Sequence, residues 1–198
     1  MPLRERKKRE TRQRLSDLAT GLFRERGFEQ VTVAEIARAA GVSAMTVFNY
    51  FPRKEDLFLD RIPEAVELFT GAVRHRAPAE PPLTALRRLA RELLDRRHPL
   101  SGVGDYASFW RVVADSPALR ARAREGVEEL ENALARALAE TDTPDPGLLA
   151  ALTVAAYRSL YTASARRLLA GDPVDEVAAD HRVRLETAFD ALERMTRR

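Results

Sequence analysis

The sequence predicts an all-α protein of about nine helices. Apolar residues recur three and four positions apart along most of the chain, which is the spacing of a helix with one buried face. Proline, glycine and helix-capping residues stand at most of the ends of these segments. No stretch alternates between apolar and polar residues as a strand does. With 198 residues, 45% hydrophobic and 32% charged, the chain fits one ordinary globular domain or two small ones.

The first helix is predicted from Thr11 to Arg26, and Gly27 ends it. Its apolar face is formed by residues at helical spacing, Leu15, Leu18, Ala19, Leu22 and Phe23. The preceding segment, Leu3–Thr11, is almost entirely charged. We expect this segment to be frayed, or helical only at its end.

Two short helices joined by a tight turn are predicted next. Thr32 and Glu35 have the S/T-x-x-E spacing of a capping box, so a helix should start at Val33. Gly41 stands where the chain leaves this helix, since glycine adopts the left-handed conformation of a helix end without strain. Ser43 is suited to cap the helix that follows.

The second short helix should end by Phe51, because Pro52 disfavours helical geometry in the residue before it. Helices this short need a packing partner, which the first helix supplies. Residues 11–51 then form a three-helix head, whose predicted core consists of Leu22, Phe23, Val31, Ile36, Val42, Val47 and Phe51.

The rest of the chain is also predicted to be helical. A helix begins at about Arg53 and contains Pro63, so we expect a kink or a break there. The Pro-rich segment Ala77–Pro82 is predicted to be a linker, and further helices follow at approximately 86–94, 103–113, 116–140, 147–170 and 173–196. The sequence thus predicts a helix-turn-helix domain at 1–54, with a basic arm at 1–10, and a second helical domain at 55–198.

The composition excludes several kinds of site. Without cysteine there is no disulfide, zinc–thiolate centre or thiol redox sensor. No apolar run approaches the roughly 20 residues that span a membrane, and no apolar segment follows the basic N-terminus as in a secretory signal, so we expect a cytoplasmic protein. The three histidines, His75, His98 and His181, lack ligand spacing, so no metal is predicted. No catalytic set of side chains stands out, and we expect neither enzyme activity nor a cofactor.

The positive charge is concentrated near the N-terminus. Residues 1–54 contain 12 Lys and Arg against 6 Asp and Glu, whereas residues 55–198 contain 21 against 24. The excess therefore lies on and before the two short helices, as in a surface that binds a polyanion. A solubilising basic tail would explain the asymmetry by itself, but the helix-turn-helix pattern beside it favours DNA.

The residues from Thr32 to Phe58 follow the pattern T-V-x-E-I-A-x-x-A-G-V-S-x-x-T-V-F-N-Y-F-x-x-K-E-D-L-F. This pattern resembles the N-terminal domain of TetR-family transcriptional regulators, and the similarity covers about residues 11–60. The helix count and the length of the remaining chain also fit this family.

The resemblance implies a homodimer that binds double-stranded DNA, with one DNA-reading head per subunit and the last two helices of each subunit forming the dimer interface. It also implies a pocket for a small-molecule ligand in the C-terminal core. Ligand binding would move the helix after the head and change the spacing of the two recognition helices, which must lie about 34–36 Å apart to reach successive major grooves. The expected function is a repressor released from a palindromic operator by its ligand.

Two other functions remain open at this stage. One is a constitutive DNA-binding or nucleoid-associated protein of the same fold that has no ligand switch. The other is a helical enzyme or carrier that uses the pocket for chemistry, which would need polar groups converging beside the aromatic residues.

Four candidate residues are assigned to phosphate contacts. The second short helix, Ala44–Phe51, should enter the major groove by its N-terminal end. Thr46 and Tyr50 carry hydroxyls on its exposed side. Lys54 lies at the predicted start of the next helix, where both its ammonium and the helix N-terminus favour phosphate, and Thr32 caps the preceding helix in the same way.

Three further residues are candidates for base contacts. Asn49 carries an amide that pairs with adenine through two hydrogen bonds, whereas Ala44 and Met45 offer only apolar contact, for instance to thymine methyls. The alternative for Met45 and Tyr50 is that they fill the core of the head.

Two positions depart from the family pattern. Phe48 stands where many members have tyrosine, and Ala34 stands where some carry an arginine that reads bases. The basic arm, which contains Arg4, Arg6, Lys7, Lys8, Arg9 and Arg12, compensates for them if it reaches the minor groove or flanking phosphates. The alternative is a solvated, disordered arm.

The candidate ligand-binding residues are aromatic side chains and one arginine. Arg158 neighbours Tyr157 and is suited to an anionic group, with a surface salt bridge as the alternative. The aromatic candidates, for which plain core packing is the alternative, are Phe69, Tyr106, Phe109, Trp110, Tyr157 and Tyr161.

Overall fold

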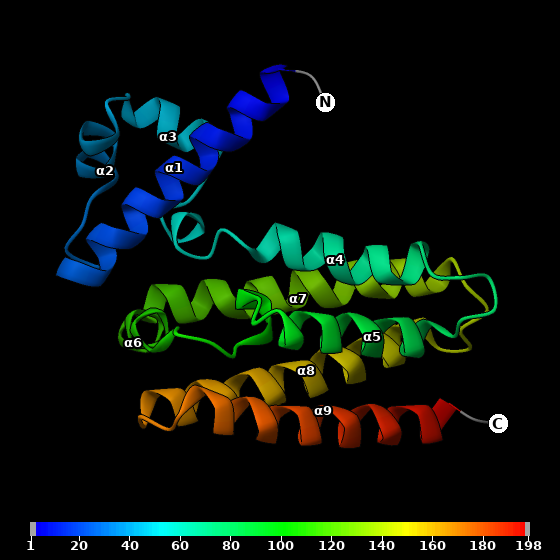
Figure 1. Cartoon of the computed structure of the whole chain (residues 1–198). Helices are drawn as coiled ribbons and strands as arrows, with labels where there is room; N and C mark the ends of the chain where they lie inside the picture. Colours follow the sequence, from blue (N-terminus) through cyan, green and yellow to red (C-terminus); the bar gives the residue numbers. More distant parts are fainter. Residues whose placement is uncertain (1–2, 197–198) are drawn as a thin grey trace. The chain divides into compact units, whose positions relative to one another are not determined.

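The computed structural model describes residues 3–196 and is all-helical over that range, without any strand (Figure 1). The helices are α1 (Leu3–Arg26), α2 (Val33–Ala40), α3 (Ala44–Tyr50), α4 (Ile62–Arg74), α5 (Pro82–Asp95), α6 (Ala107–Asp115), α7 (Pro117–Ala139), α8 (Pro146–Leu169) and α9 (Val174–Thr196). Two 3-10 helices, η1 (Glu55–Leu57) and η2 (Pro99–Ser101), complete the described range. The predicted all-α fold with about nine helices is confirmed.

The chain divides into two compact units. Unit 1 runs to Asp60 and also contains Arg111–Ala123, whereas unit 2 contains Arg61–Trp110 and the chain from Arg124 onward. Helix α7 therefore contributes its first residues to unit 1 and the rest to unit 2. The domain division after residue 54 stays a prediction, and the chain of unit 1 continues past that position.

Four predicted helix starts are wrong. Helix α5 begins at Pro82 rather than at about 86, and α6 begins at Ala107 rather than at about 103. Helix α1 begins at Leu3 rather than Thr11, because Arg, Lys and Glu are good helix formers even without an apolar face; Arg6 and Glu10 also pair one turn apart at 3.5 Å. No helix runs from Arg53 through Pro63. The chain forms η1, and α4 then begins at Ile62 with Pro63 in its first turn, where the missing N–H costs no hydrogen bond.

The core of unit 1 is aromatic at its centre. Phe23 of α1 is fully buried, and its ring centroid lies 4.9 Å from that of Phe28 and 5.8 Å from that of Phe58. The other predicted core residues divide into two groups: Leu22 and Val42 are only partly buried, whereas the buried ones are Val31, Ile36, Val47 and Phe51.

The core of unit 2 lies between α4, α5, α7, α8 and α9. Helix α5 packs against both α4 and α9, and α8 packs along α9. The apolar side chains that meet there include Phe69, Val73, Leu86, Leu134, Leu138, Val154, Leu185 and Phe189.

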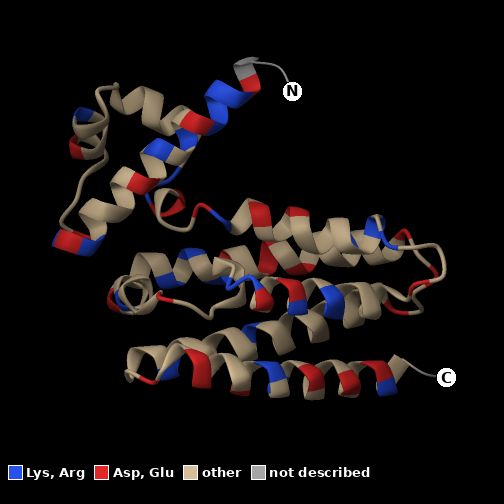
Figure 2. Cartoon of the chain, viewed as in Figure 1, with Lys and Arg blue, Asp and Glu red and all other residues tan. Residues whose placement is uncertain are grey.

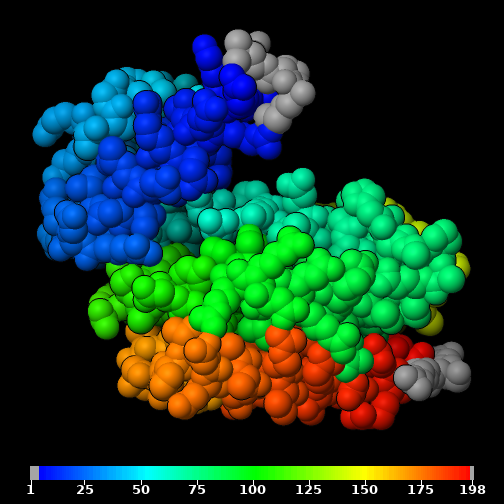
Figure 3. All heavy atoms as spheres, viewed as in Figure 1, coloured from blue at the N-terminus to red at the C-terminus, as the bar shows by residue number. Residues whose placement is uncertain are grey.

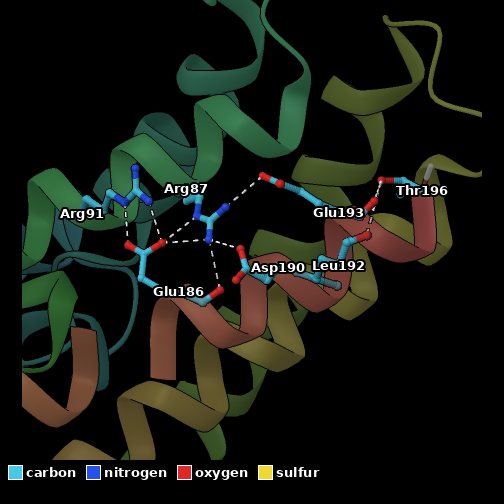
Figure 4. A network of polar contacts seen from close by, with 7 residues as sticks. All are labelled: Arg87, Arg91, Glu186, Asp190, Leu192, Glu193 and Thr196. Atoms are coloured by element: carbon cyan, nitrogen blue, oxygen red, sulfur yellow. Dashed lines mark hydrogen bonds and ion pairs between the residues drawn. The ribbon is translucent and has the colours of Figure 1, made fainter. Parts of the chain in front are cut away.

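Ion pairs connect α5 to α9 beside this core (Figure 4). Arg87 donates from Nε to Glu186 at 2.8 Å and also pairs with Asp190 and Glu193, while Arg91 binds both Glu186 oxygens at 2.6 Å. The hydrogen bonds from Arg91 and Arg87 hold the pKa of Glu186 below its usual range. The carboxylates of α9 thereby bind two arginines of α5.

Helices α8 and α9 retain exposed apolar side chains. Helix α9 appears in orange to red in Figure 3, along one surface of unit 2. Among the described residues, the large apolar side chains exposed on these two helices are Leu148, Leu169, Val183 and Met195.

Unit 2 contains a buried histidine on α9. His181 of α9 is 2% exposed, and its Nδ1 lies 2.8 Å from the hydroxyl of Ser164 on α8. Burial disfavours the imidazolium and lowers the pKa of His181 from 6.5 to about 4.

We expect acid to destabilise the protein through His181. Between pH 6.5 and pH 4 the unfolded chain binds a proton that the folded state rejects, so the free energy of unfolding falls by about 2 to 3 kcal/mol from this residue. Urea unfolding at pH 7 and pH 4.5 measures this change. In His181→Gln the free energy of unfolding should fall by about 2 to 3 kcal/mol less than in the wild type. Equal pH sensitivity in the variant and the wild type would contradict the assignment.

Candidate nucleic-acid interface

The capping box of α2 forms as the sequence predicts. The Thr32 hydroxyl accepts from the N–H of Glu35 at 3.2 Å, and Glu35 Oε2 accepts from the N–H of Thr32 at 2.8 Å. Hydrogen bonds from the Thr32 backbone, and then from Arg26 and the Thr32 hydroxyl, lower the pKa of Glu35 to about 2. Thr32 itself is exposed at the N-terminus of α2.

The tight turn after α2 is made by Gly41 and Ser43. Gly41 has φ 67°. Its N–H donates to the carbonyl of Arg38, and the N–H of Val42 donates to the carbonyl of Ala37. The Ser43 hydroxyl then accepts from the N–H of Thr46 at 3.0 Å and so caps the first turn of α3.

Helix α3 buries one face and exposes the other. Val47 is 1% exposed and faces the core, as does Phe51, which follows the helix. Met45 is 69% exposed and Asn49 is also exposed, so the alternative that Met45 fills the core is wrong. The remaining candidates on α3 are half-buried; they are Ala44, Thr46 and Tyr50.

The side chain of Lys54 contacts Phe28 of unit 1. Its Nζ donates to the carbonyl of Phe28 at 2.5 Å and lies 4.2 Å from the centre of that ring. Partial burial lowers the pKa of Lys54. A phosphate contact requires this ammonium to exchange the carbonyl and the ring for a phosphate oxygen.

The described part of the basic arm is helical and extends α1. Residues 5–10 are exposed, whereas Arg12 donates to the carbonyl of Asp60 at 3.4 Å and lies 4.5 Å from the centre of the Phe51 ring. The side chain of Arg4 lies outside the described residues. Figure 2 shows Lys and Arg along the first half of α1, whereas α3 has none.

Two contacts within unit 1 join the head to the start of α7. The Ser116 hydroxyl donates to Glu29 at 2.7 Å and accepts from the N–H of Leu119, which caps α7. Arg122, 7% exposed, donates from Nε to Asp56 of η1 at 2.7 Å. No local pattern in the sequence predicts these pairs, because their partners lie far apart along the chain.

The aromatic ligand candidates form two groups within unit 2. The rings of Phe69 and Tyr157 lie 4.9 Å apart, and the Tyr157 hydroxyl donates to the carbonyl of Leu100 at 2.8 Å. The ring of Trp110 lies 4.6 Å from that of Tyr161 and 5.3 Å from that of Phe109. Burial raises the pKa of Tyr157 and Tyr161.

The two remaining ligand candidates are Tyr106 and Arg158. Tyr106 donates its hydroxyl to the carbonyl of Arg97 at 3.0 Å, and Arg158 is exposed. Within the described part of unit 2, two buried side-chain atoms have no hydrogen-bond partner, Trp110 Nε1 and Thr153 Oγ1.

A surface hollow of about 490 Å³ lies elsewhere in unit 2. It is lined by residues between Arg76 and Thr84, of which Pro82–Thr84 belong to α5, by the turn 141–144 and by Leu149, Glu193 and Thr196, and by none of the predicted ligand residues. No group of His, Asp and Glu in the described range is arranged to hold a metal ion. None of the described helices is both long and apolar enough to cross a membrane.

Comparisons with known proteins agree with the helix-turn-helix geometry. The family model described as bacterial regulatory proteins, tetR family, matches residues 15–60. The HTH-type transcriptional regulator TcmR of Streptomyces glaucescens is 36% identical over 147 residues, which are 72% of this chain and 65% of TcmR. The match therefore spans less than two thirds of that relative.

Solved structures with this fold include two repressors. NalD, the secondary repressor of the MexAB-OprM multidrug efflux pump in Pseudomonas aeruginosa, superposes with a TM-score of 0.57 at 20% identity, over 92% of this chain and 95% of its own. FadR of Thermus thermophilus, solved in complex with lauroyl-CoA, gives 0.53 at 29% identity, over 91% and 92%.

We expect the buried pair of Arg122 and Asp56 to stabilise unit 1 far more than its exposed neighbour does. Arg122→Gln leaves a carboxylate that is 16% exposed without its closest cation and should lower the free energy of unfolding by about 3 kcal/mol. Arg53, which is 47% exposed and 3.8 Å from the same Asp56, is the matched control, and Arg53→Gln should cost less than about 1 kcal/mol. Equal losses in urea unfolding would refute this ranking.

Proposed function

We propose, on the premise that this chain belongs to the TetR family of bacterial regulatory proteins, that it is a dimeric repressor that a small-molecule effector releases from a palindromic operator. The observation that carries the proposal is the capped α2–α3 unit, whose second helix exposes Met45 and Asn49 while Val47 holds its other face in the core. A helix presented in this way fits the major groove.

The proposed DNA contacts are divided between bases and backbone. Asn49 reads adenine, with apolar contacts from Ala44 and Met45. Thr32, Thr46 and Tyr50 bind phosphates through their hydroxyls, and Lys54 does so once its ammonium leaves the carbonyl of Phe28. The exposed cations of residues 5–10 add attraction that depends on salt rather than on sequence.

The exposed apolar residues of α8 and α9 support a dimer through these helices. Side chains as large as Val183 and Met195 are 66% and 63% exposed, and a second copy of the same two helices would bury them. A palindromic site requires the α3 helices of the two subunits to lie one DNA turn apart.

The proposed effector site consists of the aromatic residues of unit 2. An aromatic lining with a few polar groups is typical of small-molecule sites. The unpaired donors Trp110 Nε1 and Thr153 Oγ1 each favour a ligand that brings an acceptor, because leaving a buried donor unpaired costs about 1 to 3 kcal/mol. FadR, a repressor of the same fold, was solved with a small molecule bound.

Helix α7 is a route by which an effector would change the head. One turn after Arg122, Gly126 packs so closely on Ile62 of α4 that an added Cβ would lie 2.6 Å from its Cδ1. A single helix thus contacts η1 of unit 1 through Arg122 and α4 of unit 2 through Gly126. A displacement of α7 by an effector would therefore change the contact between Arg122 and Asp56.

The DNA contacts are tested by selecting binding sites from random duplexes. We expect Asn49→Ala to relax the preference at one base pair per half-site and to leave the rest of the site unchanged. Lys54→Ala should weaken binding to all sequences alike and lower the salt slope by about one. An unchanged site for Asn49→Ala would remove its base-reading role, and failure of the wild type to bind any duplex would overturn the proposed function.

The effector site is tested through the single tryptophan of the chain. Because Trp110 packs on Tyr161 and Phe109, an effector bound there should change its fluorescence at the same concentrations that release the operator. Phe69→Ala and Tyr157→Phe should shift both titrations together. Release of DNA without any fluorescence change would place the effector elsewhere, and the hollow at 76–84 would be the next region to examine.

A further inference from the structure

The exposed face of α3 contains three side chains. Met45, Phe48 and Asn49 are all exposed. At the roughly 100° that each helical residue turns, they share an arc of about 100°, with Met45 between the other two and Val47 on the opposite side. Any surface that α3 contacts meets these three side chains first.

Two of the three side chains are apolar. Met45 is 69% and Phe48 is 45% exposed, and they are the large apolar side chains that unit 1 exposes within its described range. Exposed apolar neighbours on one helix turn indicate a contact with an apolar group of a partner. On the major-groove edges of base pairs, the apolar group is the C5-methyl of thymine.

The same helix lacks the residues that read guanine. Its sequence, Ala-Met-Thr-Val-Phe-Asn-Tyr, contains no arginine or lysine to bind guanine O6 and N7. Asn49 offers the amide that matches N6 and N7 of adenine. The face therefore combines one adenine-reading group with two thymine-reading groups.

We propose that the base pairs read by α3 are A·T pairs, with Asn49 on adenine and Met45 and Phe48 on thymine methyls. Phe48 is then a specificity-determining residue. The inference rests on the proposed function, since it requires α3 to lie in the major groove.

The test uses the selected binding site with each thymine replaced in turn by deoxyuridine. This change removes only the methyl group and keeps the base pairing. We expect wild-type affinity to fall about fourfold at each contacted thymine, the effect of about one buried methyl. In the Phe48→Ala variant, deoxyuridine at one thymine per half-site should no longer lower the affinity. In the Met45→Ala variant, the same should hold at a neighbouring thymine.

Phe48→Tyr is the matched control, because it keeps the ring and should keep the methyl sensitivity. Since Phe48 and Met45 are exposed, their alanine variants should retain the wild-type melting temperature, which circular dichroism checks. A selected site with G·C pairs at the positions protected by α3, or wild-type affinity that no deoxyuridine changes, would overturn the inference while leaving DNA binding intact. Absence of binding to every duplex would overturn the proposed function itself.

Discussion

The left-handed conformation of Gly41 is the constraint on which the proposed interface depends. It ends α2, satisfies two of its last carbonyls and lets Ser43 start the next helix. Because α3 has only seven residues, its direction is determined at its two ends, by this turn and by the burial of Phe51. A change in the turn would alter the direction of α3 and with it the positions of Met45 and Asn49.

Structural features that depend on a few neighbouring residues were predictable from the sequence. The capping box of Thr32 and Glu35 and the ends of α2 and α3 formed as expected, because the atoms that bond are within three or four positions of each other. The break at η1 was not predictable in this way. Asp56 is bound by Arg122, 66 positions away, and a contact at that distance leaves no periodic signal.

The same distinction holds for the candidate site. Helical spacing correctly separated the buried Val47 from the exposed Asn49, since both lie on one short helix. It did not reveal that the loop after α1 brings the ring and carbonyl of Phe28 to the Lys54 ammonium. Nor did it show that the hollow of unit 2 lies between the loop and first residues of α5, the turn before α8, the start of α8 and the end of α9, rather than among the aromatic candidates.

The contacts that Ser116 and Arg122 make with Glu29 and Asp56 also determine whether the head can be transferred to another protein by itself. The head is not a detachable N-terminal module, because Arg111–Ala123 belongs to the same compact unit. A chimeric regulator built by transplanting only residues 1–60 would set two acidic side chains against a foreign α7. An exchange of this head between relatives therefore has to include both segments, or to keep a serine and an arginine at the positions of Ser116 and Arg122 in the recipient α7.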